Sequence, residues 1–175
     1  EYTPWKAGDS SNNYVLFSEG DMDFVVVSLG FGVDAEETAW ADSVLKQFPD
    51  RNAIVLTHAY LTPSVNPDGR GSGFSYDGRQ VLDDVIKKNP NVALVLSGHE
   101  HGVSIELRRD VARKGHHVVE LLADYQFYKV NSDELGLTGV GYDSNTPLQF
   151  GSSFFRLLQF DLDKGEVAVD PYSPL

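Results

Sequence analysis

Two apolar segments that each end in histidine constrain this chain more than any other feature. Residues 52–57 are followed by His58, and residues 92–97 are followed by the Gly-His-Glu-His sequence of residues 98–101. Short runs rich in Val, Leu and Ile are typical of strands buried on both faces. In open α/β sheets the functional groups gather at the carboxyl ends of such strands. The pattern therefore predicts three imidazoles at one edge of a sheet.

The spacing of these histidines points to a metal site. In an extended segment His99 and His101 project to the same side while Glu100 points away, so two imidazoles are expected to face one spot. Neutral imidazole nitrogens favour Zn, Fe, Co, Ni or Mn over Ca or Mg. A surface loop that carries two histidines by chance is the alternative for residues 98–101, and His58 at a second strand end weakens that alternative.

The histidine motifs resemble those of a known family. Thr57-His58-Ala59 and the Gly-His-Glu-His sequence, in this order and separated by one helical segment, look like the last two metal-binding motifs of the calcineurin-like metallophosphoesterases. Weaker similarities extend the likeness over nearly the whole chain. Residues 37–45 look like the family's helix before the first of these histidines, and residues 121–126, 155–158 and 172–174 resemble the tail of its secreted bacterial members.

This resemblance implies a fold and a reaction. The fold is an α/β/β/α sandwich with mixed β-sheets, and the enzyme hydrolyses phosphomonoesters or phosphodiesters of small molecules through a metal-bound hydroxide. Two divalent or trivalent transition-metal ions (Zn, Fe or Mn) are implied, with His58 and His99 on one ion and His101 on the other. An extracytoplasmic or secreted location is also implied.

The amino-terminal motifs of the family have no suitable counterpart in this chain. The family pattern needs an Asp-x-His, a Gly-Asp and an Asn-His element. Gly20-Asp21 lies between two alternating segments, as expected for a hairpin turn, and no buried strand precedes Gly8-Asp9. We therefore expect the carboxyl-terminal half of such an enzyme, beginning inside a longer protein. With the general acid outside this chain and partial or no metal occupancy, the fragment alone is expected to be inactive.

Two other interpretations remain open. One is a mononuclear metal hydrolase in which His58, His99 and His101 bind one ion and leave a position for water. The other is a non-catalytic binding or structural domain on a phosphoesterase scaffold, because fold analogy alone does not establish a reaction.

Composition limits the partners. The chain has 175 residues, 41% of them hydrophobic, which suits a single domain over residues 1–175 with residues 1–13 as a polar linker. The net charge of −12 opposes direct nucleic-acid binding, and no apolar run approaches the roughly 18 residues of a membrane helix. Exposed sheet edges would allow a homodimer or pairing with the missing amino-terminal half.

Two further residues are weaker candidates for the site. Arg70 lies in the Gly- and Pro-rich loop of residues 59–76 and suits phosphate oxygens, although a solvated loop charge is the alternative. Asp124 ends the strand predicted at residues 116–123, where it would orient a ligating imidazole or simply shape a turn. The adjacent His116 and His117 point to opposite faces of a strand and are expected to be structural or exposed.

The remaining patterns predict the order of the elements. Asp34 and Glu37 form a capping box that begins a helix, and a second helix is expected from residue 77 or 78 to residue 89. Residues 126–152 are expected to lack regular structure. The other predicted strands occupy residues 14–17, 24–29, 103–108, 153–161 and 166–170.

Overall fold

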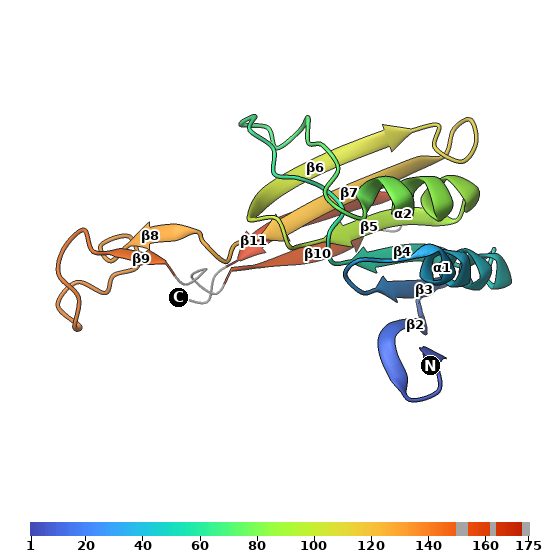
Figure 1. The fold of residues 1–175 in the computed structure, drawn as a ribbon. Coiled ribbons are helices and arrows are strands. Elements are labelled where there is room, and N and C mark those ends of the chain that lie inside the picture. The colour runs from blue at the N-terminus through green and yellow to red at the C-terminus, as the bar shows by residue number, and fades with distance from the viewer. Residues whose placement is uncertain (150–153, 162–163, 173–175) are drawn as a thin grey trace. The chain divides into compact units, whose positions relative to one another are not determined.

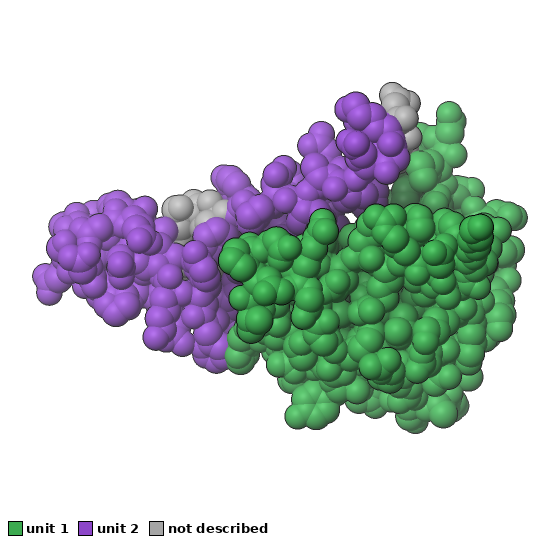
Figure 2. Space-filling view, turned by 90° about the horizontal axis from the view of Figure 1, so that it is seen from above, with its two compact units in different colours: residues 1–122 green, residues 123–175 purple. Residues whose placement is uncertain are grey.

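The computed structural model describes residues 1–149, 154–161 and 164–172 of the chain (Figure 1). The chain divides into two compact units, residues 1–122 and residues 123–175 (Figure 2). The single domain expected over residues 1–175 stays a prediction.

A mixed sheet of seven strands organises the first unit among the described residues. Its strands in chain order are β1 (Tyr2–Lys6), β2 (Asp9–Glu19), β3 (Met22–Leu29), β4 (Asn52–Thr57), β5 (Val92–Ser97), β6 (Gly102–Arg109) and β7 (His117–Asp124). The spatial order is β1-β2-β3-β4-β5-β7-β6. The pairs β1–β2 and β2–β3 are antiparallel, whereas β3, β4, β5 and β7 run parallel to one another. The described residues therefore form an α/β fold with a mixed sheet, as the sequence predicts.

The hydrophobic core lies between this sheet and its helices. The helical elements are α1 (Ala35–Gln47), α2 (Gly78–Asp84) and the 3₁₀ turn η1 (Ile86–Lys88). Alternate strand residues such as Val25, Val27 and Val55 are fully buried, because every second side chain of a strand points to the same face. They pack with Leu45 of α1 and Val81 of α2 in one cluster. None of the helices within the described ranges is long and apolar enough to cross a membrane.

Helix α1 begins at the predicted capping box. The Asp34 carboxylate accepts hydrogen bonds from the backbone N–H groups of Glu36 and Glu37 at 2.8 and 2.9 Å, and the Glu37 carboxylate accepts one from the Asp34 N–H at 2.9 Å. Glu37 also accepts a 2.6 Å hydrogen bond from the buried side chain of Asn12. The cap of α1 is thereby tied to strand β2.

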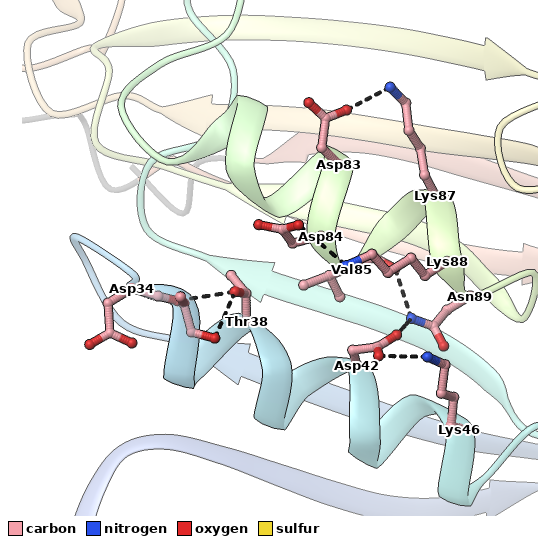
Figure 3. A network of polar contacts seen from close by, with 11 residues as sticks. Asp34, Thr38, Asp42, Lys46, Asp83, Asp84, Val85, Lys87, Lys88 and Asn89 are labelled. Atoms are coloured by element: carbon pink, nitrogen blue, oxygen red, sulfur yellow. Dashed lines mark hydrogen bonds and ion pairs between the residues drawn. The ribbon is translucent and has the colours of Figure 1, made fainter.

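The end of the second helical segment is held against α1 (Figure 3). The Asn89 side chain donates to the Asp42 carboxylate and to the Val85 carbonyl, both at 2.8 Å. Asn89 precedes a proline and is extended, as expected because proline disfavours the helical region for the residue before it. Helix α2 itself is shorter than predicted: it ends at Asp84, and the segment continues only as η1.

The expectation of a linker at residues 1–13 is wrong. This segment forms β1 and the start of β2, with Tyr2 opposite Val15 and Pro4 opposite Asn13. Its side chains are mostly polar because β1 lies at the edge of the sheet, where alternation of apolar residues is weak.

Both Gly-Asp dipeptides lie at hairpin turns. Gly8 (φ 77°) lies between β1 and β2, and Gly20 (φ 57°) lies between β2 and β3, where the residues flanking Gly20-Asp21 pair with each other. Glycine adopts this left-handed conformation without steric cost. The turn predicted at Gly20-Asp21 is confirmed.

The long loop after β4 is closed and fixed to the sheet. Leu61 forms a bridge with Phe74, so the two ends of the loop lie side by side. The Ser64 N–H donates to the Val103 carbonyl at 3.1 Å, and the Ile105 N–H donates to the Gly69 carbonyl at 2.8 Å. Since β6 is the last strand of the sheet, the loop satisfies backbone groups of an otherwise open edge.

The second unit contains two small antiparallel sheets among its described residues. Its strands are β8 (Lys129–Asn131), β9 (Pro147–Gln149), β10 (Phe155–Asp161) and β11 (Glu166–Tyr172). The hairpin β10–β11 confirms the predicted pairing, while residues 153, 163 and 173–174 of the sequence patterns lie outside the described residues. The prediction that residues 126–152 lack regular structure is wrong, because β8 pairs with β9. Strands of three residues are too short to show an alternating pattern.

Gly78 is required by the close approach of the loop backbone. A Cβ atom at this position would lie 2.0 Å from the Tyr60 carbonyl oxygen, whereas a Cβ atom at Gly98 would have no atom within 4 Å. We expect Gly78→Ala to lower the free energy of unfolding by about 2–3 kcal/mol, because backbone must move to relieve the clash. Gly98→Ala is the control, with a change of within about 1 kcal/mol. Urea denaturation followed by circular dichroism measures both, and equal stability of the two variants would contradict the prediction.

Candidate metal site at the carboxyl edge of the sheet

His58 and His99 are brought together by two neighbouring parallel strands. Thr57 at the end of β4 is paired with Ser97 at the end of β5, and the Gly98 N–H donates to the His58 carbonyl at 3.2 Å. The His58 Nε2 and His99 Nδ1 atoms lie 3.1 Å apart, and the ring centroids 4.9 Å apart. The two imidazoles predicted to meet at this edge are therefore in contact.

The separation of the two ring nitrogens suits a hydrogen bond between neutral imidazoles and also two ligands of one ion. Imidazole nitrogens bind zinc at about 2.0–2.1 Å, so two of them at angles between a right angle and the tetrahedral angle lie about 2.9–3.4 Å apart. The observed 3.1 Å falls in that range. His58 is exposed and His99 is half-buried, so the pair is open to solvent on one side. The two residues fit a transition-metal ion that keeps open positions.

The segment between β5 and β6, residues 98–101, is not extended. The expectation that His99 and His101 face one spot assumed an extended segment, so its premise is wrong. His99 has a φ of 65°, a left-handed conformation uncommon for residues other than glycine. The Glu100 N–H donates to the Gly98 carbonyl at 2.8 Å, and the chain bends through residues 99–101. The alternation of an extended strand therefore does not apply here.

His101 is an exposed residue directly before β6. Within the described ranges, no group of three or more His, Cys, Asp or Glu side chains is arranged to hold a metal ion. The assignment of His101 to a second ion stays a prediction.

Two aromatic rings that the sequence analysis did not single out surround the histidine pair. The ring centroid of Phe31 lies 5.4 Å from that of His58 and 4.9 Å from that of His99. The Tyr76 ring lies 5.9 Å from His99 and 5.8 Å from Phe31. A signal existed for Phe31, because it follows β3, a strand that ends at the same sheet edge as β4. Tyr76 lies in the long loop of residues 59–76, and the sequence did not predict where this loop lies relative to the histidines.

Hydrogen bonds fix the loops that carry these rings. The Gly32 N–H donates to the buried carboxylate of Asp77 at 2.8 Å. The Ser75 hydroxyl donates to the Glu100 carboxylate at 2.6 Å. Because Ser75 and Asp77 flank Tyr76, one short segment holds both the Phe31 loop and the histidine loop.

A buried charged network lies behind the loop that follows His58. Glu120 of β7 is fully buried and accepts a 2.6 Å hydrogen bond from the Tyr60 hydroxyl and bonds of 2.6 and 2.7 Å from Arg108 Nε. The Arg108 guanidinium also lies 4.4 Å from the centre of the Phe74 ring. Tyr60 is two residues from His58, so the network anchors the start of the loop. Sequence periodicity places Glu120 in a strand but gives no sign of its partners.

The pKa values of this network follow from burial and from the ion pair. Burial raises the pKa of the Glu120 carboxyl, and the hydrogen bonds from Tyr60 and Arg108 offset this only in part. Burial alone would lower the pKa of Arg108, but its hydrogen bonds and charge interactions with Glu120 and Tyr60 together outweigh burial and raise that pKa. Burial and the nearby Glu120 also raise the pKa of Tyr60, which therefore stays protonated and donates.

The remaining candidate residues have the following positions. Arg70 is exposed in the long loop, and its backbone N–H donates a hydrogen bond to the Asp68 carboxylate at 3.0 Å. Asp124 ends β7 and accepts a 2.9 Å hydrogen bond from the Gln126 N–H, as in a strand-terminal turn. The site roles suggested for Arg70 and Asp124 stay predictions. His116 is buried between the Val92 carbonyl and the Ala112 N–H, at 2.7 and 3.2 Å, whereas His117 is exposed.

Comparison with known proteins defines the class. The sequence profile of the calcineurin-like phosphoesterase family matches residues 2–103, which include β1 to β5 and all three histidines of the motifs. The chain belongs to this family. A relative, the uncharacterized protein YvnB of Bacillus subtilis (strain 168), is 36% identical over 174 residues. The match covers 95% of this chain but only 12% of the length of YvnB.

Removal of Arg108 tests the buried ion pair. We expect Arg108→Met to lower the free energy of unfolding by about 3 kcal/mol near neutral pH, because a buried carboxylate loses its counter-charge. The loss should be smaller in acid. A raised folded-state pKa means that Glu120 favours folding at low pH and loses this contribution as the pH rises through that pKa, and the variant raises the pKa further.

Urea denaturation at several pH values measures this dependence. Arg109→Met is the matched control, because Arg109 is the exposed neighbour on the same strand and its loss should change stability by within about 0.5 kcal/mol. A loss in Arg108→Met that is equal at all pH values would contradict the assignment.

Proposed function

We propose that the longer protein containing this chain is a metal-dependent hydrolase of small phosphoesters. The observation that carries the proposal is the 3.1 Å contact between His58 Nε2 and His99 Nδ1, at the carboxyl edge of the sheet, in a member of the phosphoesterase family. The acidic composition supports a small substrate over a nucleic acid, because a net charge of −12 repels polyanions.

The histidines have distinct proposed roles. His58 Nε2 and His99 Nδ1 hold one ion through their lone pairs, so both atoms must be unprotonated when the ion binds. His101 contributes to a second ion, with Zn, Fe or Mn as the metals. When bound, such ions polarise the phosphoryl oxygens and activate water. Arg70 binds phosphate oxygens through the paired donors of its guanidinium group.

The rest of the site lies outside this chain in the proposal. The proposal assigns no metal ligand to either Gly-Asp dipeptide, because each belongs to a hairpin turn. The remaining ligands and the general acid come from a preceding segment that pairs with this chain, or from a second copy of it. The longer protein acts outside the cytoplasm, as its resemblance to secreted bacterial members implies.

Comparison of the isolated chain with the longer protein tests the proposal. The longer protein should hydrolyse p-nitrophenyl phosphate only with added Zn²⁺ or Mn²⁺, and the isolated chain should show little or no turnover. In the longer protein, His58→Ala and His99→Ala should each lower kcat/KM by about 100-fold or more, since loss of a ligand weakens ion binding and transition-state stabilisation.

His117→Ala is the matched control, because His117 is an exposed histidine at the opposite end of its strand. Its kcat/KM should not change. Full activity in the isolated chain, or equal activity in the His99→Ala and His117→Ala variants, would refute the proposal.

A further inference from the structure

Phe31 and Tyr76 form an exposed aromatic wall beside the histidine pair. Their rings are in edge contact at 5.8 Å, and both lie within 6 Å of the His99 ring. Phe31 is 57% exposed and Tyr76 is 77% exposed. Rings so exposed bury little apolar surface, so their placement adds little to the core.

The backbone that carries these two rings is firmly held. Gly32 directly follows Phe31, and its N–H donates a hydrogen bond to the buried Asp77 carboxylate. Ser75 directly precedes Tyr76, and its hydroxyl donates a hydrogen bond to the Glu100 carboxylate. The side chains on either side of Tyr76 are therefore turned inward and bonded, while its own ring faces solvent. A wall that is fixed before a ligand arrives loses little conformational entropy on binding.

We propose that this aromatic wall binds the leaving group of the substrate, and that the leaving group carries a flat aromatic ring. This inference rests on the proposed function, because the histidine pair then marks the position of the phosphoryl group. The Phe31 ring lies 4.9 Å from His99, the separation of two packed aromatic rings. An aromatic ring joined to the phosphoryl group by an ester oxygen reaches the wall while the phosphate lies at the histidines.

The selectivity acts on the alcohol part of the ester. In the reaction, the P–O bond to the leaving alcohol breaks, water supplies the new oxygen on phosphorus, and the alcohol oxygen takes up one proton from water. Both an aryl ring and a nucleobase present a flat aromatic face, so both sources share the chemistry that the wall recognises. An alkyl leaving group has no such face.

A binding experiment tests the wall without turnover. Phenylphosphonate and methylphosphonate cannot be hydrolysed, and calorimetry gives their Kd values with the Zn²⁺-loaded longer protein. Phenylphosphonate should bind about tenfold more tightly, as expected for one aromatic contact. The double variant F31L/Y76L keeps apolar side chains but removes both rings, and the ratio of the two Kd values should fall to about one.

Tyr2→Leu is the matched control, because Tyr2 is a 53% exposed aromatic residue on β1. It should leave the ratio unchanged. Equal binding of the two phosphonates, no binding of either, or a preference that survives F31L/Y76L would overturn the inference.

Kinetics separates the two sources and the two proposals. F31L/Y76L should raise KM by about tenfold for phenyl phosphate if the wall takes aryl esters, or for adenosine 5′-monophosphate if it takes nucleobases, with KM for ethyl phosphate unchanged. If all three esters are hydrolysed and F31L/Y76L changes none of the KM values, the inference about the aromatic wall is wrong and the proposed function stands. A phenylphosphonate preference without hydrolysis of any ester defeats the proposed function, while the aromatic wall stands.

Discussion

The parallel register of β4 and β5 is the constraint on which the candidate site depends. Each strand is apolar on both faces and ends at the same level of the sheet, with Thr57 opposite Ser97. His58 directly follows Thr57, and His99 follows Ser97 by two residues; the His58 Nε2 and His99 Nδ1 atoms lie 3.1 Å apart. Burial of the two strands sets where the loops that follow them begin. The left-handed conformation of His99 then brings its ring against that of His58.

The loops around the pair are held from the buried side and exposed on the other. Glu120 and Arg108 anchor the start of the long loop through Tyr60, and Asp77 and Ser75 anchor its end. The inward-facing side chains of Glu120, Asp77 and Ser75 are each hydrogen-bonded to a neighbouring loop or strand. What remains on the outer side are imidazoles and aromatic rings. The hydrogen-bonded inner side chains thus hold the loops, while the imidazoles and aromatic rings are exposed to solvent.

Local signals in the sequence predicted much of this structure. The apolar strands at residues 52–57 and 92–97, the capping box of Asp34 and the hairpin turn at Gly20 all depend on neighbouring residues, and all are confirmed. The edge strand β1 was missed because an edge strand needs little apolar surface. The short pair β8–β9 was missed because three residues cannot show a period.

The rest of the site depends on contacts between distant residues. Sequence predicted that His58 and His99 meet, but not the left-handed backbone of His99, which the surrounding loops impose. Tyr76 reaches the pair only because the ends of the long loop are paired by Leu61 and Phe74. Glu120 meets Arg108 through the adjacency of β7 and β6, which no local pattern encodes. Because the chain belongs to the calcineurin-like phosphoesterase family, these contacts are interpreted as parts of a metal-dependent site.

The central claim is that His58 and His99 bind one transition-metal ion together. Anomalous diffraction at the zinc edge from crystals of the longer protein grown with Zn²⁺ tests it directly. We predict an anomalous peak within about 2.0–2.1 Å of both His58 Nε2 and His99 Nδ1. Zinc bound at other residues, with the two imidazoles still in direct contact with each other, would contradict the account.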